Sequence, residues 1–315
     1  MNREPKQETI FIGDIHGQAK TLKALLGRLG WKQRDGRFRG PGNAQLVFVG
    51  DLIDRGPSSR QTVDIVRELI EHDNARCVLG NHEYNAVQYH TPDPERPGQY
   101  LREHSDKNFE QHEAFLEDYA HDPTGLKDTL AWFRTLPVAI EGDGWRCVHA
   151  CWDDREIAKL TAQDDAWYLS EERWTAAAQP GQPEYRAIEI LTKGPEWKLP
   201  ADASFLDKGN HRRTHARVQW WQPNPATYRE ALQMPTTPVG LDLDQPFSER
   251  LDGYHPDAPP VFFGHYWKRD KPPKAERPNA ACIDYSAGKG DRLVAYRHRG
   301  EQQLLSDRFF EQSVI

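Results

Sequence analysis

The sequence predicts an α/β fold, and two features of the chain lead to this prediction. Short apolar runs that read as buried strands alternate with segments in which apolar residues recur at helical spacing. The apolar runs end in glycine or in a polar cluster, and a chain of 315 residues is long enough to bury a substantial core around them. In such sheets, ligands are met by loops at the carboxyl ends of the strands. The residues that follow each apolar run are therefore the first candidates for a functional site.

The first strand and helix lie between Glu8 and Gly30. The stretch ETIFIGDIHG, residues 8–17, begins as a buried strand and ends in a turn. The next segment places leucines at helical spacing before Gly30, at Leu22, Leu25, Leu26 and Leu29. This segment predicts a helix that ends at Gly30.

The second and third units repeat this order. LVFVGD, residues 46–51, reads as a strand, and Ser58 or Ser59 can cap the helix that follows it. One face of that helix is apolar and consists of Val63, Val66, Leu69 and Ile70. ARCVLGNHE, residues 75–83, gives a third strand and turn.

The rest of the chain is less regular. Residues 91–98 hold three prolines and predict a loop, after which apolar residues around 109–119 and 130–136 predict two helices, the second stopped by Pro137. WRCVHA, residues 145–150, and PVFFGHY, residues 260–266, read as further short strands. Between them, residues 152–259 are rich in proline and tryptophan and predict an insertion or cap within a single domain that covers residues 1–315.

Composition excludes several classes of protein. With 41 lysines and arginines against 48 aspartates and glutamates, the formal charge is −7, which argues against general binding of nucleic acid. The N-terminal segment is polar and the chain has no apolar run long enough to span a membrane, so we expect a cytoplasmic protein without a signal peptide. The cysteines lack the paired spacing of a zinc site and are expected to be reduced and buried: Cys77, Cys147, Cys151 and Cys282.

Metal-type ligands follow the strands. Aspartate, asparagine and histidine end the predicted strands at Asp14, His16, Asp51, Asn81, His149 and His265. Carboxylate and imidazole suit a borderline divalent ion, and a carboxylate can bridge two ions because it has two oxygens. Asp51 is the natural bridge, since bound metal ions would neutralise a charge that is otherwise costly at the end of an apolar strand.

The order GDIHG, GDLIDRG, GNHE, VHA and GHY resembles the calcineurin-like metallophosphoesterases, and the first three motifs are most similar to the branch of the phosphoprotein phosphatases and their bacterial relatives. The resemblance covers residues 9–150 and 261–297. It implies a calcineurin-like four-layer fold, in which a central β sandwich of two mixed sheets is flanked by helices.

The resemblance also implies a role for each motif residue. Asp14 and His16 would hold one metal ion, and Asp51 would bridge it to a second ion held by Asn81, His149 and His265. The ions would be two divalent metals, Mn²⁺ first, with iron, zinc or nickel as alternatives. A hydroxide shared between the ions would attack the phosphorus directly, without a covalent intermediate.

The resemblance implies a catalytic group formed by His82, Asp54 and Arg55. His82 would act as general acid, Asp54 would orient its imidazole, and Arg55 would bind phosphate oxygens through its planar fork of donors. A plain salt bridge within the turn is the structural alternative for Asp54 and Arg55. The remaining nine histidines fit no motif and are expected to be structural or surface residues.

A second phosphate-binding arginine is usual in this branch, but no clear motif marks it here. Arg213 and Arg217 are the preferred candidates in the basic run of residues 207–221, and a solvated basic face is the alternative. Tyr266 is also a candidate for substrate binding, because Tyr266, Trp267 or Trp152 could stack a base beside the metals.

Three functions remain open. We expect a phosphatase of phosphoserine or phosphothreonine type, because GDLIDRG and GNHE retain both Asp54 and Arg55. The alternative is a dinucleoside polyphosphate hydrolase, since FGHYW and residues 282–297 also resemble symmetrical diadenosine tetraphosphate hydrolases, although those typically lack the aspartate found at Asp54. A non-catalytic scaffold is the third possibility, and retention of every metal position argues against it. The substrate would be a phosphoprotein or a nucleotide, and the sequence does not indicate the oligomeric state.

Overall fold

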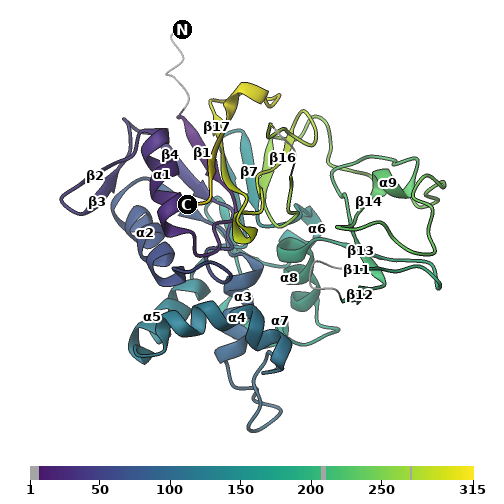
Figure 1. Ribbon diagram of the computed structural model, residues 1–315, viewed down its shortest axis with the longest axis horizontal. Coiled ribbons are helices and arrows are strands. Elements are labelled where there is room, and N and C mark those ends of the chain that lie inside the picture. The colour runs from purple at the N-terminus through teal and green to yellow at the C-terminus, as the bar shows by residue number, and fades with distance from the viewer. Residues whose placement is uncertain (1–6, 207–210, 270–271) are drawn as a thin grey trace.

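The computed structural model describes residues 7–206, 211–269 and 272–315. Two predicted segments, the polar residues 1–6 and residues 207–210 at the start of the basic run, lie outside these ranges. Figure 1 shows strands at the centre of the molecule. Helices lie on the side of α1 (Ala19–Leu29) and α2 (Ser59–His72) and below the strands, and a lobe of short strands lies beyond β16 (Ala280–Cys282).

The first central sheet contains the three strands that the N-terminal half of the sequence predicts. Its strands run in the order β18–β17–β1–β4–β5. Their bounds are Thr9–Ile12 (β1), Gln45–Phe48 (β4), Ala75–Cys77 (β5), Arg292–His298 (β17) and Phe309–Ser313 (β18). β1, β4 and β5 pair in parallel, whereas β17 is antiparallel to β1 and to β18, so the sheet is mixed. The carboxyl ends of β1, β4 and β5 therefore meet at one edge.

The second sheet orders its strands β16–β15–β7–β6–β9–β8. The bounds are Ala139–Gly142 (β6), Trp145–Val148 (β7), Thr161–Gln163 (β8), Ala166–Tyr168 (β9), Val261–Phe263 (β15) and Ala280–Cys282 (β16). This sheet is also mixed, because β15 is parallel to β7 and β16 while β6 is antiparallel to β7 and β9. The predicted strands around residues 145–150 and 260–266 are confirmed as β7 and β15.

Alternation along the strands explains how the two sheets pack. Neighbouring side chains of a strand point to opposite faces, so Phe11 points between the sheets while Ile10 and Ile12 point towards the helices. Phe11 stacks on Phe262 of the other sheet, with ring centroids 3.8 Å apart. Both faces of such sheets are covered, which is why their strands are continuously apolar rather than alternating.

Helices cover the outer faces of the sandwich. Their bounds are Ala19–Leu29 (α1), Ser59–His72 (α2), Asn81–His90 (α3), Asp106–Tyr119 (α4), Pro123–Arg134 (α5), Asp154–Ile157 (α6), Trp174–Ala177 (α7), Pro183–Lys193 (α8) and Tyr228–Ala231 (α9). Short 3₁₀ helices span Glu171–Arg173, Ala287–Lys289 and Ser306–Arg308. The helices predicted before Gly30, after Ser58 and before Pro137 are confirmed as α1, α2, α4 and α5.

The segment predicted as an insertion, residues 152–259, divides into two parts. Its first part belongs to the sandwich, because β9 pairs with β6 and β8 pairs with β9. Residues 161–168 of the predicted insertion or cap are therefore part of the sandwich. The later part forms the lobe with α9 and the strands Glu196–Lys198 (β10), Phe205–Leu206 (β11), Arg212–Arg213 (β12), His215–Val218 (β13) and Leu232–Gln233 (β14).

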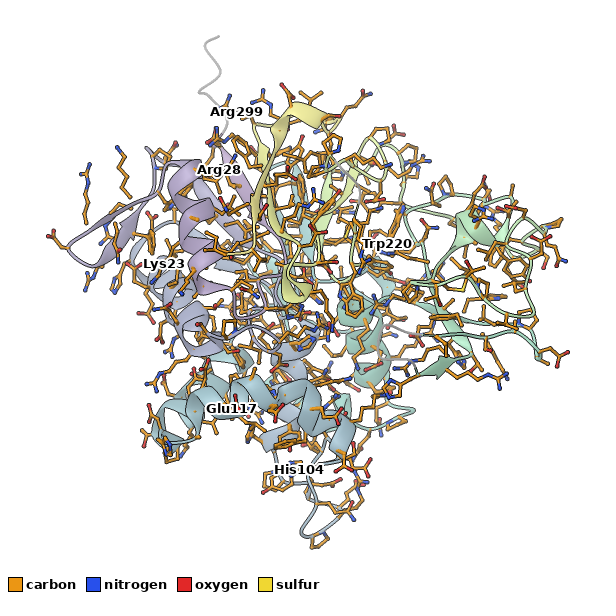
Figure 2. All side chains as sticks on the ribbon, viewed as in Figure 1. Lys23, Arg28, His104, Glu117, Trp220 and Arg299 are labelled. Atoms are coloured by element: carbon orange, nitrogen blue, oxygen red, sulfur yellow. The ribbon has the colours of Figure 1, made fainter. Side chains whose placement is uncertain are left out.

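The lobe has an apolar cluster of its own, which includes Leu199, Phe205, Val218 and Phe247. Trp220 lies where the lobe meets the sandwich (Figure 2), and its ring centroid is 5.0 Å from that of Phe263 on β15. The lobe is thus packed against the second sheet and does not extend freely from it.

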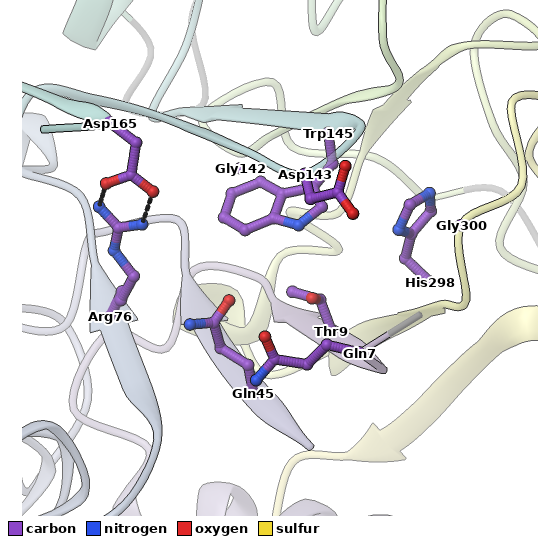
Figure 3. A pocket seen from close by; sticks show the side chains of 10 residues that line it. All are labelled: Gln7, Thr9, Gln45, Arg76, Gly142, Asp143, Trp145, Asp165, His298 and Gly300. Carbon is purple, nitrogen blue, oxygen red and sulfur yellow. Dashed lines mark hydrogen bonds and ion pairs between the residues drawn. The ribbon is translucent and has the colours of Figure 1, made fainter. Parts of the chain in front are cut away.

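Polar side chains line the edge of the sandwich opposite the carboxyl ends of β1, β4 and β5. Figure 3 shows a hollow there, between the start of the first sheet and the hairpins of the second sheet. Arg76 of β5 makes a two-pronged ion pair with Asp165, with N···O distances of 2.6 and 2.7 Å, so it ties the two sheets together. A hairpin, Lys32–Arg34 (β2) with Arg37–Arg39 (β3), lies outside the sandwich.

Two further predictions concern membrane spans and cysteines. Within residues 7–206, 211–269 and 272–315, no helix is both long enough and apolar enough to cross a membrane. The four cysteines are buried and unpaired, as the sequence predicts.

Candidate metal centre

Two loops at the ends of β1 and β4 are bonded directly to each other. The carbonyl oxygen of Asp51 accepts hydrogen bonds from the backbone N–H groups of Ile15 and His16, at 3.0 and 2.9 Å. Because β1 and β4 are parallel neighbours, their loops leave the sheet side by side. The predicted ligands Asp14, His16 and Asp51 are therefore brought together and are all buried.

The third loop joins this pair through Gly80 and Asn81. A side chain at Gly80 would collide with the backbone nitrogen and carboxylate of Asp51, so only glycine allows the loops to approach this closely. Asn81 is the first residue of α3. Its Oδ1 lies 3.0 Å from His149 Nε2 and 2.8 Å from His265 Nδ1.

His149 and His265 come from the second sheet, after β7 and β15. His149 Nδ1 lies 2.6 Å from the carbonyl oxygen of Val49, so that nitrogen carries a proton, and Nε2 faces the side-chain oxygens of Asn81 and Asp51. The backbone N–H of His265 donates to Asp14 Oδ2 at 3.1 Å. Both sheets thus supply side chains to a single cluster.

Asp51 lies at the centre of this cluster. Its Oδ1 is 3.4 Å from His149 Nε2, and its Oδ2 is 3.6 Å from His16 Nε2 and 3.9 Å from His82 Nε2. Burial alone would raise the pKa of Asp51, but the surrounding imidazoles, with His149 foremost, lower it well below its usual value. Asp51 is therefore an anionic carboxylate with each oxygen facing different histidines.

The cluster fits two divalent cations. Two overlapping groups have potential ligand atoms within 4.8 Å of one another, His16–Asp51–His82 and Asp51–His149–His265, and they share only Asp51. Asp14 Oδ1 is buried without a hydrogen-bond partner among the described residues, which is costly unless a cation neutralises it. Carboxylate, imidazole and amide donors suit manganese, iron or zinc. Asp14 is therefore a better ligand candidate than His82, whose Nδ1 is already bonded to Asp54.

The predicted pair of His82 and Asp54 is in contact, and a third residue joins it. His82 Nδ1 lies 2.5 Å from Asp54 Oδ2, and His112 Nδ1 lies 2.9 Å from Asp54 Oδ1. Burial favours a raised pKa for Asp54, but hydrogen bonds from His112 and His82 outweigh it and hold the pKa well below its usual value. The carboxylate is ionised and only accepts hydrogen bonds.

Arg55 lies against two imidazoles of the site. Its NH1 is 2.6 Å from His16 Nε2, and its NH2 is 3.1 Å from His82 Nε2. His16 Nδ1 is bonded to the Ile53 carbonyl oxygen at 2.9 Å, so its Nε2 accepts the Arg55 bond with its single lone pair. A metal ion on His16 Nε2 and the Arg55–His16 hydrogen bond therefore exclude each other.

The two arginines proposed for the insertion lie on different small sheets. Arg217, on β13, donates from NH1 to the carbonyl oxygen of His265 at 2.8 Å, and its guanidinium carbon lies 5.4 Å from the Trp267 ring centroid. Arg55 lies 4.9 Å from the same centroid. Arg213 lies on β12, which pairs with β11 rather than with β13. The structure thus brings Arg217 to the edge of the cluster.

Tyr266 does not occupy a position where a substrate could reach it. It is fully buried and its hydroxyl donates to the Val218 carbonyl oxygen at 3.2 Å, which corrects the expectation that it contacts substrate. His265 has a positive φ of 68°, so the chain turns sharply and Tyr266 points into the core while His265 points into the site. Trp152 is also buried, whereas Trp267 is partly exposed.

Sequence reasoning missed three residues that hold the site together. Glu83, the last residue of GNHE, accepts hydrogen bonds from the backbone N–H groups of Asp51, Leu52, Ile53 and Gly80. Asp284 accepts a hydrogen bond from the Trp267 N–H at 3.0 Å, and His112 bonds to Asp54. Glu83 could have been found from its place in the GNHE motif, whereas His112 lies in no motif.

Comparison with known proteins identifies the family. The model of the calcineurin-like phosphoesterases matches residues 8–266. The chain is 41% identical over 72 residues to the asymmetrical bis(5'-nucleosyl)-tetraphosphatase PrpE of Oceanobacillus iheyensis, which is 23% of this chain and 29% of that protein. It is 33% identical over 142 residues to the symmetrical bis(5'-nucleosyl)-tetraphosphatase of Ralstonia nicotianae, 44% of this chain and 40% of that protein. The chain thus spans less than half of the length of these relatives.

Solved structures match over a greater length, at lower identity. A protein serine/threonine phosphatase from Saccharomyces cerevisiae is 14% identical, with a TM-score of 0.50 over 100% of this chain and 82% of that one. A cold-active protein-tyrosine phosphatase from a Shewanella species is 13% identical, with a TM-score of 0.50 over 98% and 81%. These matches bear on the fold alone, and together with the two mixed sheets they confirm the predicted fold class. Because the family model spans most of the chain, including every residue from Asp14 to His265, the protein belongs to the calcineurin-like phosphoesterase family.

Proposed function

We propose that this protein is a metal-dependent phosphatase that hydrolyses phosphomonoesters of the phosphoserine or phosphothreonine type. The observation that carries this proposal is the His82–Asp54 pair, which lies beside a cluster of metal-type ligands. Arg55 contacts His82 of the pair and His16 of the cluster. A phosphomonoesterase needs a proton donor for a poor alkoxide leaving group and a cationic fork for the phosphate oxygens, and these residues would provide both.

Two divalent ions would be held by Asp14 and His16 on one side, by Asn81, His149 and His265 on the other, and by Asp51 between them. We propose Mn²⁺, with iron, zinc or nickel as alternatives. When bound, such ions stabilise negative charge on phosphoryl oxygens and lower the pKa of a water molecule.

The protein side chains would divide the remaining work. His82 would keep its Nδ1 proton against Asp54 and, as the imidazolium released from Arg55, would donate a second proton from Nε2 to the leaving-group oxygen. Arg55 would bind two phosphate oxygens once a cation on His16 Nε2 displaces it from that nitrogen. Arg217 would be the second phosphate-binding arginine, since its bond to the His265 carbonyl oxygen and its contact with Trp267 hold it beside the cluster.

A dinucleoside polyphosphate hydrolase is the second candidate, because the relatives from Oceanobacillus and Ralstonia carry that name. Trp267, which is partly exposed beside the cluster, is the aromatic residue best placed to contact a base. However, alignments of 72 and 142 residues cannot contain the whole site, since Asp14 and His265 are 251 positions apart. They therefore support the hydrolysis of phosphoesters more than a particular leaving group.

One comparison of substrates tests the proposal. We would measure kcat/KM for a phosphothreonine peptide and for diadenosine tetraphosphate with Mn²⁺-loaded protein, using Asp51→Asn as the blank. The proposal expects a clear preference for the peptide. Preference for the dinucleotide would favour the second candidate, and a metal-loaded protein that turns over neither these nor a broad panel of phosphate esters would indicate a binding scaffold.

A further inference from the structure

His112 lies on α4, far from the loops that carry the predicted ligands, yet it reaches the site. Its Nδ1 is 2.9 Å from Asp54 Oδ1, while His82 Nδ1 is 2.5 Å from Asp54 Oδ2. One carboxylate is thus held between two imidazoles, with one oxygen bonded to each. The two histidines are separated by 30 positions in the sequence and lie on α3 and α4, whereas Asp54 lies in the loop after β4.

The chemistry of these contacts fixes the direction of each hydrogen bond. An ionised carboxylate has no proton to give, so both Nδ1 atoms must donate. His82 therefore presents Nε2 to the site, where the Arg55 NH2 lies 3.1 Å away. The position of the His82 imidazole depends on where the Asp54 carboxylate points.

Asp54 needs a second partner to point in one direction. It lies in the turn after β4 with a positive φ of 69°, and the terminal torsion of an aspartate is soft, so a single hydrogen bond leaves the carboxylate free to rotate. His112 supplies the second bond from a rigid position. It is buried, and its ring stacks on Phe115 at 4.7 Å and lies 5.2 Å from Tyr89.

We propose that His112 is a positioning residue for phosphoester hydrolysis, which acts through the Asp54 carboxylate to aim the His82 imidazole at the leaving group. This proposal rests on the proposed function, in which His82 protonates the leaving-group oxygen. Among the described residues, the hydrogen bond of His112 is to Asp54 rather than to a metal-type ligand or Arg55, so His112 should affect proton transfer rather than binding of the phosphate group.

The sharpest test removes the donor and keeps the ring. His112→Phe retains an aromatic side chain against Phe115 but leaves Asp54 Oδ1 without its hydrogen bond. His112→Asn retains a donor, because an asparagine amide nitrogen can occupy the position of a histidine Nδ1. His90→Asn is the matched control, since its ring lies 5.6 Å from that of His112 in the same aromatic cluster. Thermal unfolding would establish that each variant is folded.

The readout is the dependence of kcat on the leaving group. With a phosphothreonine peptide we expect His112→Phe to lower kcat about 10- to 100-fold, which is part of the roughly 10²- to 10⁴-fold that general acid catalysis contributes. With 2,4-dinitrophenyl phosphate, whose leaving group needs no proton, we expect less than a threefold change. KM should stay within twofold for both substrates, His112→Asn should recover most of the activity, and His90→Asn should match the unsubstituted protein. Equal losses on both substrates, or no loss on the peptide, would overturn the proposal.

A second measurement is independent of turnover. We would record proton NMR spectra of chelator-treated protein whose histidines are labelled with ¹⁵N. The Nδ1 proton of His82, which is hydrogen-bonded to the Asp54 carboxylate, should give a far-downfield resonance. We expect His112→Phe to broaden or shift this resonance and His112→Asn and His90→Asn to preserve it. If the unsubstituted protein hydrolyses no phosphate ester, the proposed function fails while this resonance still decides the role of His112. An unchanged resonance in folded His112→Phe would overturn that role. If His112→Phe does not fold, His112→Ala takes its place under the same criteria.

Discussion

Replacing Glu83 by alanine should destabilise the protein strongly, because this carboxylate is the acceptor for four buried backbone N–H groups. Oε2 accepts from Asp51 at 2.8 Å and Gly80 at 3.1 Å, and Oε1 accepts from Leu52 at 2.8 Å and Ile53 at 3.3 Å. Glu83 is fully buried, so alanine would leave these donors without a partner.

The magnitude follows from the cost of each unpaired donor. A buried polar group without a partner costs about 1–3 kcal/mol, and we take the lower end because water can enter the space that the side chain leaves. Four donors then give a loss of about 4 kcal/mol. This is a large part of the roughly 5–15 kcal/mol by which a domain of ordinary stability is folded. Glu83→Gln should lose about half as much, since its amide oxygen still accepts from one pair of donors while its NH₂ group faces the other pair.

Urea unfolding of chelator-treated protein, followed by tryptophan fluorescence, would measure this loss. The matched control is Glu113→Ala, which removes an exposed glutamate from α4 and should change the free energy of unfolding by less than about 0.5 kcal/mol. A loss below about 1 kcal/mol for Glu83→Ala would refute the reasoning, since it would mean that the four donors find other acceptors at little cost.

Three further predictions concern the site. Asp51→Asn should nearly abolish turnover and lower the metal content measured by mass spectrometry, whereas His82→Ala should keep its metal and slow poor leaving groups most; equal loss of metal in His82→Ala would show that it is a ligand. Arg217→Gln should weaken inhibition by inorganic phosphate about tenfold or more, as expected for the loss of a charge-assisted bond. Arg213→Gln should leave this inhibition unchanged. Weaker inhibition in Arg213→Gln but not in Arg217→Gln would show that Arg213 is the phosphate-binding arginine. The lowered pKa of Asp54 stabilises the fold above the unfolded pKa of about 4, and this contribution is lost as pH falls towards the folded pKa. Asp54→Asn should therefore unfold with a shallower dependence on pH below about pH 4 than the unsubstituted protein, measured by thermal scans in chelator.

The sequence was informative wherever a candidate ligand follows directly from a strand. The proximity of Asp14, Asp51 and His149 could be predicted because an apolar run fixes the strand and a few residues then fix the loop. The same reasoning could not find His112, which meets Asp54 across 58 positions through the packing of α4. It also proposed Tyr266 as a substrate contact, whereas the structure buries this side chain, because a motif does not show which neighbours of His265 pack in the core. Position along a strand is a local property, whereas contact across helices and turns depends on packing.

Backbone strain explains why the site needs so much support. Six of the ten non-glycine residues with positive φ among the described residues lie in the loops of the site: His16, Asp51, Asp54, Arg55, His265 and Trp267. A seventh, Ser286, donates its backbone N–H to Asp284. Such conformations cost roughly 1–3 kcal/mol each and persist only when their surroundings hold them. Aspartate tolerates this region better than most residues, which suits the two aspartates.

Arg55 and Trp267 tolerate positive φ poorly and are held by specific bonds, Arg55 by the imidazoles and Trp267 by the Asp284 carboxylate. At the centre, Glu83 holds the backbone of Asp51, and the Asp51 carbonyl oxygen holds the turn of His16. The strained turns direct charged side chains into a single buried space, and the hydrogen bonds of Glu83 keep these turns from relaxing. This is why we expect the largest loss of stability at Glu83, a residue that points at no ligand position itself.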